Sequence, residues 1–559
     1  MLGASISMCV IVLIASPLEA AWIADGVPVC LADSVQANAR IIADGTGGAI
    51  IVWPDHRAGN DDVYAQRLDA DGNRLWGTYG TLVYAEGNDQ KNVALVSDGA
   101  GGAIITWEDY HAPPSSDVFA QRMYANGTRA WVRPTGICSA PGSQLGLRII
   151  PDGSGGAIIA WSDLRSGSGD IYAQRISAAG SVLWTLNGVG VCTADQNQLD
   201  VDIVSSGSSG VILAWRDDRS VTKCEIYAQR LNLAGIPAWA ADGLPVCTSA
   251  GYKDGLRAVS DGSGGAIAAW ADFRNGSTSD IFAQRISPSG DVLWASAGVP
   301  VCTGLNDQNW LDIDMDGSGG AVLCWMDFRA DVPPGSNIDL YAQRIDPSGT
   351  VLWAEGGLVV CANSNKQYWP CLTGDGAGGA IIAWHETVGM FQDNVLAQLV
   401  GAQGALLRPG EALSISSAPE IQGWPHIAGD GHGAAFVTWD DTRNGGHDIY
   451  AQYAGFAMTQ VPGGEVPRTR LVVDCYPNPF NPLTTLRFDL PVGGRVRLAV
   501  YDVAGRLLRT LLDVDLPAGS HTAVWDGRDS VGRSLASGSY FARLQAGGRL
   551  QTVRMSLVR

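Results

Sequence analysis

The sequence has very little lysine and a marked shortage of positive charge. Only Lys91, Lys223, Lys253 and Lys366 are lysines among 559 residues, and 37 Lys and Arg stand against 56 Asp and Glu, for a formal net charge of −19. A protein that binds nucleic acid needs a basic face to neutralise phosphates. The composition therefore argues against a nucleic-acid partner.

Long hydrophobic runs are also absent from the mature chain. After residue 20, no stretch approaches the eighteen or more apolar residues that cross a bilayer, so we expect no transmembrane segment. Residues 1–20 contain a shorter apolar run, from Ile6 to Ala15, followed by Ser16, Pro17 and the small residue Ala20. This pattern is typical of a signal peptide, and it predicts a secreted or cell-surface protein.

The motifs that mark common active sites are missing. The sequence has no H-E-x-x-H, no G-x-S-x-G, no Walker loop and no C-x-x-C pair. Its glycine-rich DGxGG segments precede strand-like runs, so they lack the helix N-terminus that makes a phosphate cradle. We therefore predict no catalytic residue, no bound cofactor and no enzyme.

Cysteine is present, with eleven residues, but its placement does not favour a disulfide framework. Six cysteines occupy one slot of successive repeats, in strings such as GVPVC: Cys30, Cys138, Cys192, Cys247, Cys302 and Cys361. Equivalent positions of neighbouring repeats are usually too far apart for a bridge, so we expect small buried side chains there. Cys361 and Cys371 are the one pair whose bridging deserves a test.

An internal repeat of about 54 residues dominates the sequence. The typical period carries a DGxGG-type turn, which the fourth repeat replaces with SSGSSG, then a strand containing tryptophan, a YAQR-like strand, the dipeptide LW and a G-x-x-V-C segment. The intervals between the strand-ending tryptophans are 54 to 59 residues. These tryptophans are Trp53, Trp107, Trp161, Trp215, Trp270, Trp325, Trp384 and Trp439.

Each period supplies four short β-rich runs separated by turn residues, and helical periodicity is absent. Runs such as AIIAWSD are apolar on both faces and must be covered on both. We therefore predict an all-β protein with an eight-bladed β-propeller over residues 21–455. The mature chain begins with the tail of a repeat, so an N-terminal strand would complete the last blade. An open β-solenoid or a stack of separate sandwiches is the alternative.

The recurrent W-x-D-x-R motif is the strongest candidate for chemistry in the repeats. In the third repeat it places Asp163 and Arg165 after Trp161, and we expect the three on one face of a strand. A motif present in most repeats favours a structural ion pair over a catalytic site. The acidic segments 55–62 and 441–448 could hold Ca²⁺, and the metal-binding residues otherwise remain unknown.

The pattern changes towards the C-terminus. Residues 456–474 are a Pro- and Gly-containing linker, and residues 475–559 show alternating strands typical of an Ig-like sandwich. Near its start the segment contains Tyr476, Pro477, Asn478, Pro479, Phe480, Asn481 and Pro482, and further along it contains Trp525 and Tyr540. In these residues it resembles the FlgD-type Ig-like domain, a relative of the type A sorting domains of the type IX secretion system. The resemblance implies a role in export or surface attachment through the secretion machinery.

Three functions stay open at this stage. The first is a secreted or cell-surface scaffold whose propeller binds a protein or glycan partner. The others are an extracellular hydrolase with its site on the funnel face and a purely structural surface protein. Function in a repeat array is expected where the repeat is broken. The longest departures are residues 111–116, 330–337 and 385–394.

Overall fold

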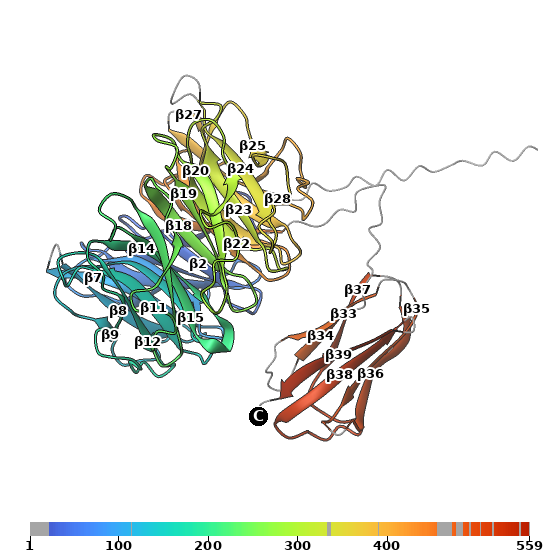
Figure 1. The fold of residues 1–559 in the computed structure, drawn as a ribbon. Coiled ribbons are helices and arrows are strands. Elements are labelled where there is room, and N and C mark those ends of the chain that lie inside the picture. The colour runs from blue at the N-terminus through green and yellow to red at the C-terminus, as the bar shows by residue number, and fades with distance from the viewer. Residues whose placement is uncertain are drawn as a thin grey trace, which may run out of the picture. The chain divides into compact units, whose positions relative to one another are not determined.

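The computed structural model divides the chain into two compact units, Met1–Ala457 and Met458–Arg559 (Figure 1). It describes residues 22–112, 115–331, 337–389, 391–455, 472–476, 484–490, 494–503, 505–516, 519–546 and 549–557. In these ranges the regular secondary structure is β-strand, apart from one short 3₁₀ turn at Gly207–Ser209. None of the described helices is long and apolar enough to cross a membrane.

The first unit is built from repeated four-stranded antiparallel sheets, as the repeat predicted. We number those formed by the described residues from 1 to 8. Sheet 1 contains β2 (Arg40–Ala43), β3 (Ala49–Asp55), β4 (Asp62–Leu68) and β5 (Thr81–Tyr84), and sheet 2 contains β6 (Gln90–Ser97), β7 (Ala103–Ala112), β8 (Ser115–Met123) and β9 (Thr135–Cys138). Sheet 3 contains β10 (Gln144–Pro151), β11 (Ala157–Asp163), β12 (Asp170–Ile176) and β13 (Val189–Cys192), and sheet 4 contains β14 (Gln198–Ser205), β15 (Val211–Asp217), β16 (Glu225–Leu231) and β17 (Leu244–Cys247).

Sheets 5 to 8 repeat the same order, except that the last sheet takes its fourth strand from the N-terminus. Sheet 5 contains β18 (Lys253–Ser260), β19 (Ala266–Asp272), β20 (Asp280–Ile286) and β21 (Val299–Cys302), and sheet 6 contains β22 (Gln308–Met315), β23 (Ala321–Asp327), β24 (Asp339–Ile345) and β25 (Leu358–Cys361). Sheet 7 contains β26 (Lys366–Gly374), β27 (Ala380–Gly389), β28 (Gln392–Val400) and β29 (Leu413–Ser416), and sheet 8 contains β30 (Gln422–Gly429), β31 (Ala435–Asp441), β32 (Asp448–Ala454) and β1 (Val27–Cys30).

The DGxGG segments form the tight turns between the first and second strands of a sheet. In sheet 3, Oδ1 of Asp152 accepts hydrogen bonds from the backbone N–H groups of Ser154 (2.7 Å) and Gly156 (2.8 Å). A Cβ on Gly156 would lie 2.1 Å from the carbonyl oxygen of Ile176, so only glycine fits there. The strand that follows, β11, is buried along its whole length, as a strand covered on both faces must be.

The tryptophan of each LW dipeptide connects one sheet to the next. Trp76 donates its indole N–H to the carbonyl oxygen of Ala125 in sheet 2, at 3.0 Å. Trp131, Trp184, Trp239, Trp294 and Trp353 make the same bond to the following sheet. Trp22, next to β1, donates to Ala70 of sheet 1 at 2.9 Å. The same contact therefore joins successive sheets from sheet 1 to sheet 7 and joins sheet 8 to sheet 1, whereas sheet 7 has Arg408 in place of the tryptophan.

The first strands of neighbouring sheets contact one another, and the first strand of sheet 8, β30, contacts the first strand of sheet 1, β2. These strands therefore surround a common axis, and Figure 1 labels β2, β14, β18 and β22 in the middle of the first unit. The N-terminal strand β1 pairs antiparallel with β32, with Val27 opposite Ala451. This pairing covers the outer edge of sheet 8 with a strand from the other end of the unit.

The second unit is a two-sheet sandwich in its described residues. One sheet contains β33 (Val472–Tyr476), β34 (Thr484–Leu490) and β37 (Gly519–Trp525). The other contains β36 (Leu507–Leu516), β35 (Gly494–Tyr501), β38 (Gly538–Ala546) and β39 (Arg549–Leu557). Both sheets contribute to one core, which includes Phe488, Val500, Trp525 and Met555. β33 begins at Val472, inside the segment that we expected to be a linker.

Candidate functional site

The W-x-D-x-R motif forms a closed hydrogen-bonded box in sheet 3. Asp163 accepts the indole N–H of Trp161 at 2.7 Å, and it accepts the backbone N–H and Nε–H of Arg165 at 3.0 and 2.9 Å. The guanidinium also lies 3.8 Å from the ring centre of Tyr172 and donates to Sγ of Cys138 at 3.2 Å. The indole N–H of Trp161, the carboxylate of Asp163 and two guanidinium nitrogens of Arg165 are thus used inside the protein, which favours a structural role for the motif.

One detail of this prediction is wrong. Strand β11 ends at Asp163, so Arg165 does not lie on the strand but in the turn after it, where its side chain folds back onto the carboxylate. Equivalent boxes are formed by Asp55, Asp217, Asp272, Asp327 and Asp441 with the arginines two residues later. Sheets 2 and 7 lack the arginine, and the indole N–H groups of Trp107 and Trp384 have no partner there.

The cysteines of the recurrent slot complete these boxes. The nine cysteines in the described part of the chain are all free, including Cys361 and Cys371, so the bridge considered between these two is wrong. Burial raises the pKa of Cys138 to about 12, which keeps its thiol protonated and unreactive. The expectation of small buried side chains in the recurrent slot agrees with these positions.

The acidic segments offer little to a cation. In the segment 55–62, Asp55 is held by Trp53 and Arg57, and Asp62 accepts a hydrogen bond from Asn60. Within the described ranges, no group of three or more His, Cys, Asp or Glu side chains is arranged to hold a metal ion.

The first strand of each sheet carries a residue with a left-handed backbone at the same position, two residues after a buried Gln or, in sheet 5, Lys. In sheets 2 to 8 the pairing with the second strand shifts register there, so the position is a β-bulge. In sheets 1 to 5 it holds Asn, Gly or Asp, the residue types that tolerate this conformation. These residues are Asn38, Asn92, Gly146, Asp200 and Gly255.

Sheets 6, 7 and 8 place tryptophan at this position. Trp310, Trp369 and Trp424 have φ values of 52°, 46° and 50°, in a region that bulky side chains rarely adopt. The Trp369 ring stacks on Trp424, with centres 5.4 Å apart, and meets Trp310 edge-on at 6.2 Å. Trp310 is 59% exposed and Trp424 is 40% exposed. We call these three residues the tryptophan cluster.

A second position recurs two residues further along the same strands. Along β22, Trp310 is exposed, Leu311 is buried and Asp312 is half-buried, as expected where alternate residues share a face. The corresponding position holds Arg40, Arg148 and Arg257 in sheets 1, 3 and 5, and we call these three the arginine cluster. It holds His426 in sheet 8, whose Nε2 lies 2.6 Å from Nη1 of Arg40.

Several ionisable groups near the axis have perturbed pKa values. Burial raises the pKa of Asp440 to about 7 and lowers that of His385 to about 4. Burial also raises the pKa of Glu108, which is fully enclosed and accepts hydrogen bonds from Asn92 and Tyr110. Glu108 is therefore a structural carboxyl that a substrate cannot reach.

Sequence reasoning missed the tryptophan cluster because it aligned the repeats on their second strands. The signal was present in the segments NWLDI, YWPCL and GWPHI, which lie in three consecutive repeats. Of the 19 tryptophans, eight end the second strands, seven belong to the sheet-to-sheet contacts and Trp525 lies in the second unit. The remaining three are the cluster, so they are the tryptophans that the repeat does not explain.

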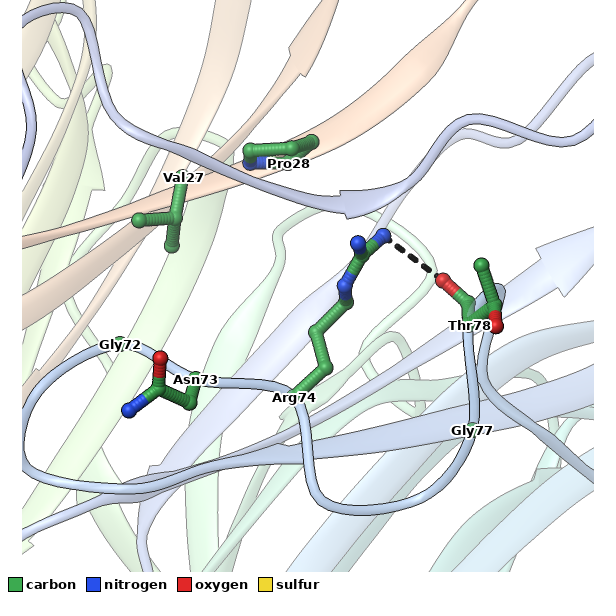
Figure 2. A pocket seen from close by; sticks show the side chains of 7 residues that line it. All are labelled: Val27, Pro28, Gly72, Asn73, Arg74, Gly77 and Thr78. Carbon is green, nitrogen blue, oxygen red and sulfur yellow. Dashed lines mark hydrogen bonds between the residues drawn. The ribbon is translucent and has the colours of Figure 1, made fainter.

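A hollow of about 560 Å³ lies beside β1 and the turn between β4 and β5 (Figure 2). Its lining residues are Val27, Pro28, Gly72, Asn73, Arg74, Gly77 and Thr78. Figure 2 shows that Arg74, its one charged side chain, turns to the backbone of Thr78, where Nη1 donates to the carbonyl oxygen at 2.7 Å. The hollow offers few groups for a ligand, so the axis is the stronger candidate.

The sorting-domain motif falls mostly outside the described residues. Tyr476 ends β33, whereas residues 477–482 lie beyond the ranges that the structure describes. Further along, the described part contains Trp525 and Tyr540, two other residues of the resemblance, which pack edge-on with ring centres 5.3 Å apart.

Comparison with known proteins identifies the second unit. Residues 485–549 match the family model of the FlgD Ig-like domain. No curated protein matches the chain. Similar solved structures include a protein of unknown function from Dyadobacter fermentans (10% identity, 78% of this chain and 98% of that chain, TM-score 0.37). They also include an α-L-arabinanase from Penicillium chrysogenum (14%, 65% and 92%, TM-score 0.32) and a fucose-specific lectin from Aleuria aurantia (11%, 56% and 93%, TM-score 0.27).

Proposed function

We propose that this chain is an exported, non-catalytic scaffold whose first unit, an eight-bladed β-propeller, binds a glycan on the tryptophan cluster. The observation that carries the proposal is the left-handed backbone of Trp310, Trp369 and Trp424. Each tryptophan in this conformation costs about 1–2 kcal/mol. Backbone strain of this kind clusters at functional sites, where it holds a side chain in place for a ligand.

The shape of the cluster favours a sugar. An exposed indole presents a flat apolar face with negative charge density, which suits the C–H-rich face of a pyranose ring. Two stacked rings and a third at 84° to its neighbour provide such faces in more than one direction. A globular protein partner would need a broad apolar patch, whereas Asn38, Asn92 and Asp200 occupy other positions of the same ring.

The buried carboxyls support a binding role over hydrolysis. A glycosidase needs two carboxyl groups that both reach the sugar. Glu108 is fully buried, and Asp440 is almost fully buried with Oδ2 bonded to the backbone N–H of Asn38 at 3.0 Å. We therefore do not assign Glu108 and Asp440 as a catalytic pair.

We assign the two end segments of the chain to export and surface attachment. Residues 1–20 act as a signal peptide, and the FlgD Ig-like domain acts as a type A sorting domain that exports or anchors the first unit. This part of the proposal is tested by deleting either segment in the native cell and following the protein by fractionation. If both deletions leave secretion and surface exposure unchanged, these roles are wrong.

Glycan binding is tested on the full chain by affinity electrophoresis through a panel of polysaccharides, with calorimetry for any that retard it. We expect Trp369→Ala to weaken binding at least tenfold, because it removes the central ring of the cluster. Phe391→Ala is the matched control, since Phe391 is 69% exposed and lies outside the cluster. Binding to no polymer, or equal binding by Trp369→Ala, would refute the proposal, and release of reducing ends would favour a hydrolase.

A further inference from the structure

The arginine cluster occupies the position two residues further along the first strands than the position of the tryptophan cluster. Trp424 and His426 are alternate residues of β30, and Nη1 of Arg40 lies 2.6 Å from Nε2 of His426. A guanidinium carries only donors, so this contact requires a lone pair on Nε2: His426 is neutral and accepts from Arg40. Burial and the charge of Arg40 lower the pKa of His426 well below its usual value, which agrees with this assignment.

The arginines have few counter-charges. Arg148 forms an ion pair with Asp202 at 3.5 Å, whereas Arg40 and Arg257 form none in the described part of the chain. Instead, Nη1 of Arg257 donates to the carbonyl oxygen of Leu256 at 2.9 Å, and Nη1 of Arg40 donates to that of Ala39 at 3.2 Å. Among the described residues, these two guanidinium groups therefore bond to backbone carbonyls and have no carboxylate within ion-pair distance, although the charges of Asp440 and Asp312 act on them from further away.

The axial carboxylates are committed to the backbone of the next sheet. Asp202 accepts the N–H of Ala258 at 2.8 Å, Asp312 accepts that of Leu372 at 2.9 Å, and Asp314 accepts that of Gly374 at 2.9 Å. Burial also raises the pKa of Asp312. These acids hold neighbouring sheets together and only partly balance the arginines.

Partly buried cations without partners are costly, and an anion at the axis would offset that cost. The repulsion among the arginines shows in Arg40, where burial and then the charge of Arg148 lower the pKa to about 10. Guanidinium groups bind carboxylate and sulfate oxygens with charge-assisted hydrogen bonds, often two at a time. The site is also unusual in a chain with a net charge of −19, whose general field repels anions.

We propose that the arginine cluster recognises the carboxylate or sulfate group of an acidic glycan whose sugar ring lies on the tryptophan cluster. This inference rests on the proposed glycan-binding function and narrows its ligand to polyanionic polysaccharides. The tryptophans would provide affinity for the ring, and Arg40, Arg148 and Arg257 would select for its acidic substituent. The proximity of Trp424 to His426, and of His426 to Arg40, connects the two parts of the site.

The test compares each acidic polymer with its neutral counterpart on the full chain. Alginate, polygalacturonate and hyaluronate are used beside their carboxyl-reduced forms, and chondroitin sulfate beside its desulfated form. We expect at least one acidic polymer to bind ten times more tightly than its neutral form, and this preference to fall as salt rises. Arg257→Gln and Arg40→Gln should remove the preference, whereas Arg257→Lys should retain part of it.

The outcomes separate this inference from the function on which it rests. If acidic and neutral forms bind equally and Trp369→Ala weakens both, glycan binding stands and selection by charge is wrong. If no polymer binds, the proposed function itself is wrong. Thermal shifts with sodium glucuronate and with inorganic phosphate form a further arm. Stabilisation by phosphate alone, dependent on Arg257, would reassign the cluster to a free anion and overturn the proposal. Thermal melting of each variant excludes misfolding as the cause of lost preference.

Discussion

The first and second strands of the sheets differ in how strictly their residues recur from sheet to sheet. At the end of the second strands, the box of Trp, Asp and Arg recurs with nearly the same distances, such as 2.8 Å in sheet 1 and 2.9 Å in sheet 6 between indole and carboxylate. On the first strands, the bulge recurs but its residue changes from Asn, Asp or Gly to Trp. The residues that recur thus maintain the fold, and the tryptophans that depart from the repeat form the candidate site.

The largest expected effect comes from removing the strand that joins sheet 8 to sheet 1. A chain starting at Asp33 lacks Trp22 and β1, whose residues Val29 and Cys30 are fully buried. We expect it to lose on the order of 5 kcal/mol or more of unfolding free energy, from the lost buried area and ladder. Denaturant unfolding of the first unit measures this, with a chain starting at Ala21 as the control. Equal stability of the two chains would show that β1 does not close the ring.

The next largest effect is the difference in unfolding free energy between replacing a tryptophan of the box and replacing one of the tryptophan cluster. Trp161→Ala empties a fully buried site and should cost about 3–5 kcal/mol of unfolding free energy. Trp310→Ala removes a side chain that is 59% exposed and should cost less than about 1 kcal/mol. Both are measured by chemical denaturation. Similar losses at the two positions would mean that the cluster belongs to the core and not to a binding site.

A smaller effect separates the complete boxes from the incomplete ones. Asp163→Asn leaves the guanidinium of Arg165 without its carboxylate, and we expect a loss of about 2–3 kcal/mol. Asp109→Asn is the matched change in sheet 2, where the arginine is missing and burial raises the pKa of the carboxyl. It should cost less than about 1 kcal/mol, because a neutral amide replaces a poorly stabilised charge. Equal losses would contradict the structural role of the arginine.

Much of the fold could be predicted because its cause is local and repeated. The turn residues, the apolar strands and the tryptophan spacing indicated four-stranded units, and the truncated repeats at both ends indicated a strand supplied by the N-terminus. The site could not be predicted in the same way. The left-handed conformation of Trp310 depends on the bulge in β22, and the approach of Arg40 to His426 joins residues 386 positions apart. Neither relation shows in the repeat pattern, and the contacts of the box arginines, such as those of Arg165 with Cys138 and Tyr172, were likewise visible only in the packed sheets.

The smallest effect tests the strain at the axis. Trp310→Asn and Trp310→Ala both remove the ring contact with Trp369, but asparagine tolerates the left-handed backbone better than alanine does. We therefore expect the asparagine variant to be more stable by about 0.5–1 kcal/mol, even though alanine is the smaller change in polarity. The matched pair at Trp161, Trp161→Asn and Trp161→Ala, lies on an ordinary buried strand, and there asparagine should be the less stable of the two. Denaturant midpoints of the four variants measure both differences. If alanine is preferred at position 310 as well, the backbone there is unstrained in solution, and the tryptophans are not held at the axis against a conformational cost.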